Sequence, residues 1–249
     1  MINNLIEINE KEIFKNIKQN KKYKKKNFNL KGIDKEFNFK INNFYKKEEL
    51  DGLLKEILKY KWKQIDINGY TKFDNKYNKE YKGSKRLTFY SEDLSDLIWG
   101  ELKNIIPKYR IFDKENIDVE KNSIWKPIGI NPLFRLMKYK KGSILVPHYD
   151  APYIQSEKEK TLTTIVLYLT TNKSGATRFL KDNRKEHNYK DNNEIKINDN
   201  DILIKELPEI GKIIVFDHRL YHDSELLIED ENKIILRTDI LYEKEGKNV

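Results

Sequence analysis

From residue 133 onward the chain shows a succession of short strands separated by turns, and this pattern constrains the fold more than any other feature. Eight candidate strands lie near residues 133–139, 143–149, 161–170, 177–180, 201–206, 212–217, 222–228 and 233–242. Short strands at regular spacing are typical of antiparallel sandwiches and barrels. We therefore predict a mainly β fold, a double-stranded β-helix or jelly roll.

The residues before this series are predicted to contribute helices. Apolar residues recur at helical spacing from Asn43 to Leu58, and again from Leu94 to Ile106, where Pro107 ends the pattern. The stretch between them, with Trp62 and several tyrosines, reads as loop-rich. We expect the two helices to cover one face of the barrel. The 249 residues then divide into a domain over 41–243, with helical support at 41–110 and a jelly-roll core at 133–243. A basic extension over residues 1–40, partly helical and partly disordered, precedes this domain.

Three residues of the strand series form a candidate metal site. His148 and Asp150 end one strand, and His222 follows another. Because side chains of a strand alternate between its faces, His148 and Asp150 point to the same side. One imidazole from a neighbouring strand completes a set of two histidines and one carboxylate. That set leaves coordination positions open and is used by non-haem Fe(II) oxygenases.

A basic pair follows the third candidate ligand. Lys233 comes eleven residues after His222, and Lys233 and Arg237 share one face of the last predicted strand. A buried cation beside an open iron site suits a dicarboxylate cosubstrate. Arginine fits this role because its planar fork can hold a carboxylate by two hydrogen bonds.

The two other histidines of the chain fit the site less well. His187 lies in a polar segment without periodicity and reads as part of a solvated loop. His218 lies four residues before His222, a spacing that pairs ligands on a helix, but the residues before it read as a strand. We interpret His218 as structural or as a support for the ligands, with replacement of His222 as the alternative.

Three runs of residues, in order, repeat the motifs of a known family. They are Arg135, Tyr139 and Gly142 before His148 and Asp150; Thr163 to Leu169 followed by Gly175, Thr177 and Phe179; and Pro208, Gly211 and Phe216 leading to His222. In this order and at this spacing, the chain resembles the Fe(II)/2-oxoglutarate-dependent dioxygenases of the prolyl-hydroxylase-like branch. The resemblance covers about residues 41 to 243. Where the family often has two adjacent glycines, this chain has Ser174-Gly175-Ala176.

The resemblance implies a set of site residues and cofactors. His148, Asp150 and His222 are expected to ligate Fe(II), with 2-oxoglutarate and O₂ as cosubstrates. A basic residue of the last strand is expected to pair with the far carboxylate of 2-oxoglutarate. Lys233 matches the spacing of the prolyl-hydroxylase branch, whereas Arg237 matches related oxygenases and is slightly favoured for its fork. Tyr139 either adds a hydroxyl to the same carboxylate or is a packed strand aromatic.

Charge and composition restrict the partners of the chain. Residues 1–33 hold nine lysines and three glutamates, which leaves +6 of the total net charge of +9 at this end, centred on Lys21–Lys26. Such a cluster allows nucleic-acid binding or a role as a localisation signal, although the richness of the whole chain in Lys, Asn and Ile is the stronger explanation. There are 0 cysteines, and we find neither a secretory signal nor an apolar run long enough to span a membrane. We expect an intracellular protein, cytoplasmic or nuclear.

The expected activity is that of a dioxygenase that hydroxylates a substrate and releases succinate and CO₂. The prolyl-hydroxylase-like resemblance favours a prolyl or other side chain of a protein or peptide. One alternative is a nucleic-acid-oxidising, demethylase-type enzyme. Another is a jelly-roll binding module without catalysis, which the complete His148, Asp150 and His222 set argues against.

Overall fold

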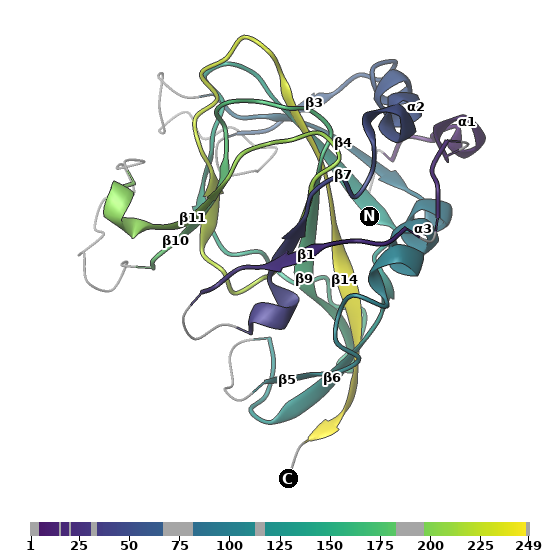
Figure 1. Cartoon of the computed structure of the whole chain (residues 1–249), viewed down its shortest axis with the longest axis vertical. Helices are drawn as coiled ribbons and strands as arrows, with labels where there is room; N and C mark the ends of the chain where they lie inside the picture. Colours follow the sequence, from purple (N-terminus) through teal and green to yellow (C-terminus); the bar gives the residue numbers. More distant parts are fainter. Residues whose placement is uncertain are drawn as a thin grey trace.

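Two facing β-sheets form the centre of the protein in the computed structural model, which describes residues 5–14, 16–19, 21–30, 34–66, 82–112, 118–182 and 197–247 (Figure 1). Within these residues the larger sheet has ten strands and the smaller has four. The main path of the larger sheet runs β1 (Lys25–Asn27), β2 (Phe39–Ile41), β12 (Ile213–Asp217), β9 (Glu159–Tyr168), β14 (Lys233–Lys247), β7 (Leu133–Tyr139), β4 (Lys85–Tyr90) and β3 (Lys63–Gln64).

Two further strands extend the larger sheet beside this path. β6 (Ser123–Ile130) pairs with the second half of β14, and β5 (Arg110–Phe112) pairs with β6. The smaller sheet runs β11 (Ile202–Glu206), β10 (Thr177–Leu180), β13 (His222–Ser224) and β8 (Leu145–His148). All strand pairs of both sheets are antiparallel. The predicted mainly β jelly roll is confirmed, and each of the eight predicted strands corresponds to one of β7 to β14.

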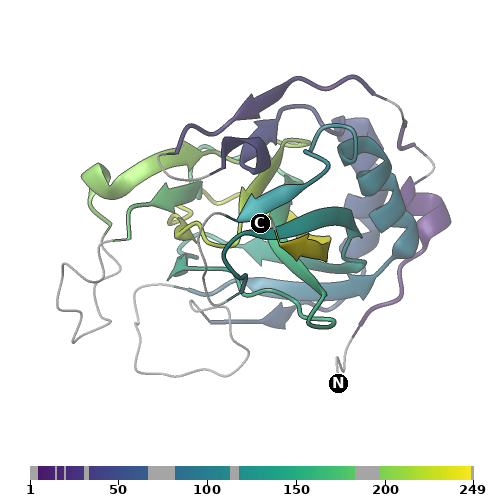
Figure 2. The ribbon, with the colours of Figure 1, turned by 90° about the horizontal axis from the view of Figure 1, so that it is seen from below.

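Helices cover the outer face of the larger sheet. α2 (Lys47–Ile57) and α3 (Glu92–Leu102) lie on the side of this sheet that faces away from β10 and β11 (Figures 1 and 2). The short helix α1 (Glu10–Phe14) packs against α2. Ser91 begins α3 because its side chain accepts a hydrogen bond from Leu94 N. The prediction that two helices cover one face of the barrel is confirmed. None of the helices among the described residues is long and apolar enough to cross a membrane.

The alternation of side chains along β14 creates two separate hydrophobic cores. Ile234 and Leu236 point outward and pack in the core beneath the helices. Ile235 points inward and packs between the two sheets. Lys233 and Arg237 share the inward face with Ile235, because strand residues two apart lie on the same side. The inward face of β14 is therefore apolar at Ile235 and basic on both sides of it, at Lys233 and Arg237.

Strand β4 lies in a stretch that the sequence analysis interpreted as loop-rich, and that interpretation was wrong for these residues. Leu87 and Phe89 are buried under the helices, while Arg86 lines a cavity on the opposite face. The residues of β4 do alternate between two faces, as in any strand, but the face that carries Arg86 is polar because it lines this cavity. Much of the rest of the stretch, residues 67–81, lies outside the described residues.

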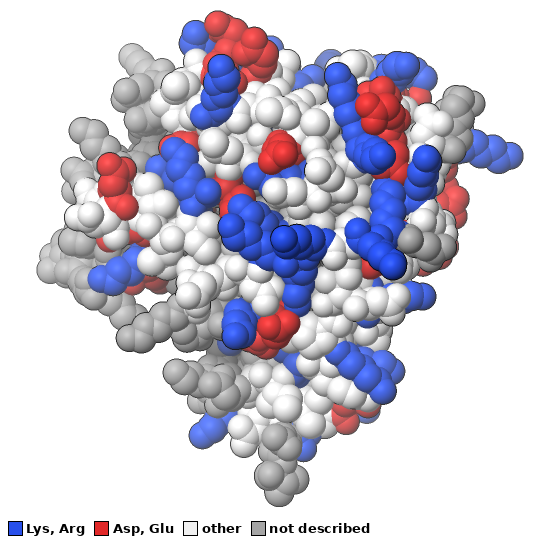
Figure 3. Space-filling model, in the orientation of Figure 1, with Lys and Arg blue, Asp and Glu red and all other residues white. Residues whose placement is uncertain are grey.

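The basic cluster near the N-terminus contributes the edge strand β1. Lys22, Lys24 and Lys26 are exposed, and Figure 3 shows basic side chains gathered over β1. Lys21 and Lys25 alternate with them and form ion pairs with Glu49 and Glu36 at 2.7 and 2.9 Å. Lysines on an exposed edge strand hinder pairing with other chains. This arrangement gives the cluster a structural role, and nothing in it supports binding of a nucleic acid.

The described residues before position 41 also pack closely on the domain. Phe37 and Phe39 are buried in the outer core, and β2 pairs with β12 of the larger sheet. The division into an extension over 1–40 and a domain over 41–243 stays a prediction.

Candidate metal and cosubstrate site

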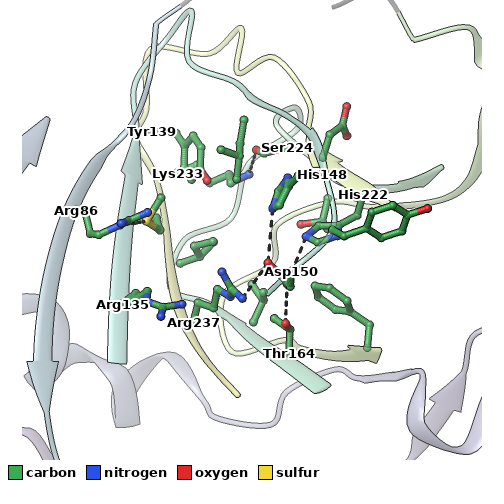
Figure 4. Close-up of a pocket in the computed structure, with 18 of the residues that line it drawn as sticks. Arg86, Arg135, Tyr139, His148, Asp150, Thr164, His222, Ser224, Lys233 and Arg237 are labelled. Atoms are coloured by element: carbon green, nitrogen blue, oxygen red, sulfur yellow. Dashed lines mark hydrogen bonds and ion pairs between the residues drawn. The ribbon is translucent and has the colours of Figure 1, made fainter. Parts of the chain in front are cut away.

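The three predicted metal ligands lie together where β8 and β13 meet. His148 ends β8, His222 begins β13, and the two residues are direct partners in the antiparallel pairing of these strands. Asp150 follows β8. One ligand atom of each residue lies within 4.8 Å of the others, and Figure 4 shows the three side chains turned toward one another. The structure thus brings together the residues that the sequence grouped.

Each histidine ring is oriented by a hydrogen bond to a backbone carbonyl. Nδ1 of His148 lies 2.8 Å from the Val146 oxygen, and Nδ1 of His222 lies 2.8 Å from the Leu220 oxygen. A carbonyl oxygen only accepts, so Nδ1 is the donor in both rings and Nε2 keeps its lone pair when the ring is neutral. Each Nε2 lies 3.6 Å from an Asp150 oxygen. Histidines that bind metals are typically oriented by such a bond at the other nitrogen.

The buried side chains of the site carry the protonation states that a metal requires. Burial lowers the pKa of His222 to about 4, so this imidazole is neutral at pH 7. Burial alone would raise the pKa of Asp150, but above all the charge of Arg237 holds it well below its usual value. Asp150 also accepts a hydrogen bond from Thr164 Oγ1 at 2.6 Å. The site therefore combines two imidazoles with one carboxylate, and this donor set fits Fe(II) with open coordination positions.

His218 does not belong to this group of ligand atoms. It is buried, and its Nε2 lies 3.3 Å from Asp239 Oδ1. Its backbone oxygen accepts a hydrogen bond from Asp150 N at 3.3 Å. His218 thus supports the loop that carries Asp150, in line with the structural interpretation. His187 lies outside the described residues.

Lys233 lies farther along the same cavity, and its ammonium group forms no ion pair with a carboxylate of the described residues. Nζ donates to the Gly175 oxygen and to Ser224 Oγ, both at 2.6 Å, and lies 4.3 Å from the centre of the Tyr139 ring. Burial lowers the pKa of Lys233 to about 7, against the opposite effect of Asp223 and Glu225. Gly175 has a φ of +69°, a conformation that favours glycine, and this turn directs its carbonyl oxygen at Lys233.

Arg237 is engaged with carboxylates of the site itself. Its Nη2 lies 2.8 Å from Asp150 Oδ1 and 3.4 Å from Asp239 Oδ1. Its Nε is buried and has no hydrogen-bond partner in the part of the chain that the structure describes. Arg237 and Lys233 are four residues apart on one strand, which separates their backbones by about 13 Å. The two candidate cations thus lie at different depths of the cavity, and only Arg237 touches the metal-ligand group.

A cavity of about 250 Å³ connects these residues. His148, Asp150, His222, Lys233, Arg237 and Tyr139 all line it, and Tyr139 is fully buried. Its wall also includes residues to which the sequence analysis gave no role, namely Arg86, Arg135, Thr164 and Ser224. Arg135 and Thr164 could have been found by parity, since they lie on the cavity face of β7 and β9, two residues from Met137 and Val166.

Comparisons with known proteins were made for the sequence and for the structure. A sequence model of the phytanoyl-CoA dioxygenase family matches residues 39–226, about three quarters of the chain. No curated protein sequence matches this chain.

Among solved structures, a Trichoplax adhaerens prolyl hydroxylase in complex with a peptide fragment of the hypoxia inducible factor oxygen degradation domain is similar at a TM-score of 0.51. It shows 14% identity, with 82% of this chain and 83% of that chain covered. A viral collagen prolyl hydroxylase from Paramecium Bursaria Chlorella virus-1, in its 2-oxoglutarate complex, has a TM-score of 0.46 and 18% identity over 83% and 96% of the two chains. HygX from Streptomyces hygroscopicus, with nickel and 2-oxoglutarate bound, has a TM-score of 0.49 and 9% identity over 83% and 82%.

Proposed function

Because the chain belongs to the phytanoyl-CoA dioxygenase family and is a 2-oxoglutarate-dependent dioxygenase that uses Fe(II) and O₂, we propose that His148, Asp150 and His222 hold its iron. The single observation that carries this assignment is the convergence of their ligand atoms within 4.8 Å. The hydrogen bonds at both Nδ1 atoms support it, because they leave Nε2 as the ligand atom of each ring. Membership of this enzyme family also sets aside the non-catalytic binding module.

We further propose that Lys233 anchors the far carboxylate of 2-oxoglutarate. An ammonium group has three N–H donors, and the bonds to Gly175 and Ser224 use two of them. A buried cation without a paired carboxylate is costly, and a bound anion removes that cost. Arg237, which the sequence analysis slightly favoured for its fork, is instead paired with Asp150 and Asp239. Tyr139 and Ser224 line the cavity beside Lys233 and complete this subsite.

The residues of the cavity orient the reactants and shield them from water. When bound together, Fe(II), 2-oxoglutarate and O₂ supply the oxidising chemistry that converts 2-oxoglutarate to succinate and CO₂ and hydroxylates the substrate. Arg237 and Thr164 hold the Asp150 carboxylate in one orientation, and the carbonyls of Val146 and Leu220 do the same for the two imidazoles. Such supporting contacts fix a metal site more precisely than its ligands alone.

For the substrate we propose a prolyl or other side chain of a protein or peptide. Large side chains are exposed on the segment that follows β8: Tyr149, which lines the cavity, is 40% exposed, and Tyr153 and Ile154 farther along the segment are 45 and 61% exposed. An exposed segment of this kind that starts at the cavity suits a polypeptide substrate. The Trichoplax prolyl hydroxylase with a similar fold is itself seen in complex with a peptide. The demethylase alternative lacks comparable support, since the basic N-terminal cluster lies on the edge strand β1 and beside it, and Lys21 and Lys25 of this cluster are engaged in ion pairs.

The test is an anaerobic titration of metal-free protein with Fe(II) and 2-oxoglutarate, followed by visible absorption of the chelate. We expect an absorption band that Asp150→Ala and His148→Ala abolish and that Lys233→Met shifts to higher 2-oxoglutarate concentrations. A band of full strength in Asp150→Ala would refute the ligand assignment. An unchanged 2-oxoglutarate affinity in Lys233→Met, with a loss in Arg237→Met, would return the anchor to Arg237.

A further inference from the structure

The cavity contains more positive charge than iron and 2-oxoglutarate binding require. Arg135 on β7 is the direct cross-strand partner of Arg237 on β14, and Arg86 on β4 is the partner of Met137. All three arginines line the cavity. Figure 4 shows Arg86 and Arg135 reaching in from adjacent strands on the side where Arg237 lies. Like charges directly opposite each other destabilise a sheet, so this arrangement calls for a compensating anion.

Arg135 is the arginine without a direct anionic partner. Among the described residues it forms no hydrogen bond or ion pair, and Asp239 and Asp150 act on it only from a distance. Burial and the charge of Arg237 outweigh these two carboxylates and lower the pKa of the Arg135 guanidinium from its ordinary value. Asp150 and Asp239 are both bonded to Arg237 instead. Arg135 is half-buried and reaches the cavity, so its donors are available to a molecule that enters there.

The charges around the cavity indicate what kind of group would fit beside Arg135. The charges of a bound Fe(II) and a bound 2-oxoglutarate cancel, and Lys233 is the cation assigned to the cosubstrate. Among the described residues, Asp150 and Asp239 both form ion pairs with Arg237, and neither forms one with Arg135. Arg135 thus lines the cavity beside its cross-strand partner Arg237 without an ion-pair partner of its own.

We propose that Arg135, with Arg237 next to it, binds an oxyanion group of the primary substrate, so that the enzyme selects a peptide with an acidic residue adjacent to the side chain it hydroxylates. This inference rests on the proposed function of the site. The planar fork of a guanidinium matches the two oxygens of a carboxylate. A phosphorylated residue offers the same oxyanion chemistry, and the experiment below separates the two sources. In this reading Arg135 is a specificity residue, and Arg86 adds positive potential at its side.

The experiment measures binding of three blocked dipeptides to protein loaded with Mn(II) and 2-oxoglutarate. The probes are N-acetyl-prolyl-glutamate amide, its glutamine counterpart and its phosphoserine counterpart, with Kd determined by NMR titration. We expect the glutamate probe to bind at least about tenfold tighter than the glutamine probe, because hydrogen bonds between two charged groups are stronger than those to a neutral amide. Tighter binding of the phosphoserine probe than of the glutamate probe would identify a phosphate as the preferred source.

Two variants make this test specific. Arg135→Gln is expected to reduce the preference to within about twofold, whereas Arg135→Lys, which keeps the charge but loses the fork, retains part of it. Lys138→Gln is the matched control: it removes one positive charge from the same strand on the opposite face, where Nζ lies 4.4 Å from the centre of the Trp62 ring. It should leave the preference intact. Thermal unfolding verifies that Arg135→Gln is folded, and loss of a like-charge pair should not lower its Tm.

The outcomes separate this inference from the proposed function. Equal binding of all probes by the unaltered protein, or no binding of any, overturns the oxyanion subsite. A tenfold loss of 2-oxoglutarate affinity in Arg135→Gln also overturns it, because Arg135 then belongs to the cosubstrate site. Failure of the unaltered protein to bind 2-oxoglutarate at all refutes the proposed function, whatever the probes show.

Discussion

Arg237 forms an ion pair with Asp150, with 2.8 Å between Nη2 and Oδ1, and so holds the only carboxylate of the candidate ligand group in place. The other Asp150 oxygen is held by Thr164. A cation that touches a metal ligand orients that ligand and keeps it ionised, but it also withdraws some of its charge. The relationship therefore supports our proposal that Arg237 belongs to the metal side of the cavity and that Lys233 anchors the cosubstrate.

We predict that Arg237→Met weakens metal binding by about 10- to 100-fold, as is typical when a group that orients a metal ligand is removed. Arg237→Lys should recover part of the affinity, because it restores the charge without the fork. Metal affinity is measured by Mn(II) titration, with circular dichroism as the control for folding. An unchanged Kd for Mn(II) in Arg237→Met would show that Asp150 does not depend on this partner.

Lys233 leads to a prediction about proton uptake. With a pKa lowered to about 7 by burial, its ammonium group is only partly protonated at neutral pH. A bound carboxylate favours the charged form, so 2-oxoglutarate binding should raise this pKa and take up a proton. Affinity for 2-oxoglutarate should consequently fall as pH rises above about 7. Titration calorimetry at pH 8 in buffers of different ionisation enthalpy measures the uptake.

The control for this prediction is Lys233→Arg, which stays protonated throughout. Its 2-oxoglutarate binding should show neither proton uptake nor a decline between pH 7 and pH 9. If the unaltered protein takes up no proton at pH 8, Lys233 is not the group that meets the cosubstrate.

Strand β14 at the candidate site could be predicted from the sequence, together with its inward face, because side chains of a strand alternate between its two faces. In β14 the odd-numbered residues Lys233 and Arg237 face the cavity while Ile234 and Leu236 face the helices. Parity alone places both cations on the inner face. It cannot say which of them meets a carboxylate of the protein, because Asp150 reaches Arg237 through a loop and not through a strand register.

The remaining elements were missed for reasons that are also physical. In β4, Arg86 and Thr88 occupy the face that a buried strand usually fills with apolar residues, so the polar cavity hides the pattern. In β1, Lys25 forms an ion pair with Glu36, and Lys21, just before this strand, forms one with Glu49, so each pairs with a glutamate in a later segment of the chain. Propensity and periodicity are local, and neither reveals a partner that only the tertiary fold supplies.

The buried ion pair between Arg110 and Asp217 allows a prediction about the free energy of unfolding and its dependence on pH. Asp217 at the end of β12 forms ion pairs with Arg110 and with Arg219. The side chains of Asp217 and Arg110 are almost completely buried. We expect Asp217→Asn to lower the free energy of unfolding by about 3–5 kcal/mol, because it leaves the Arg110 charge buried and unpaired. Urea denaturation at pH 6 measures this loss.

The pH dependence of the same pair has a defined sign. Burial would raise the pKa of Asp217, but Arg110 and Arg219 hold it below its usual value. The carboxylate therefore contributes stability above its unfolded pKa of about 3.9, and this contribution disappears as pH falls through the lower folded value. The difference in stability between the unaltered protein and Asp217→Asn should shrink below about pH 4. A constant difference from pH 6 to pH 2 would contradict this account.

Gly211, in the turn before β12, supports a final prediction about how the helical layer is attached. Its φ is +79°, and a Cβ atom there would lie 1.7 Å from the Tyr45 oxygen, a backbone atom that cannot swing aside. Tyr45 N also donates to the Gly211 oxygen at 3.2 Å, so this contact fixes the segment that leads into α2. Gly211→Ala should cost at least about 1–2 kcal/mol for the left-handed backbone alone, and more for the displaced contact. Gly129→Ala in β6, where no atom lies within 4 Å of a new Cβ, is the matched control and should change Tm little. Equal Tm values for the two variants would mean that the turn at Gly211 adjusts freely and does not hold α2 against the sheet.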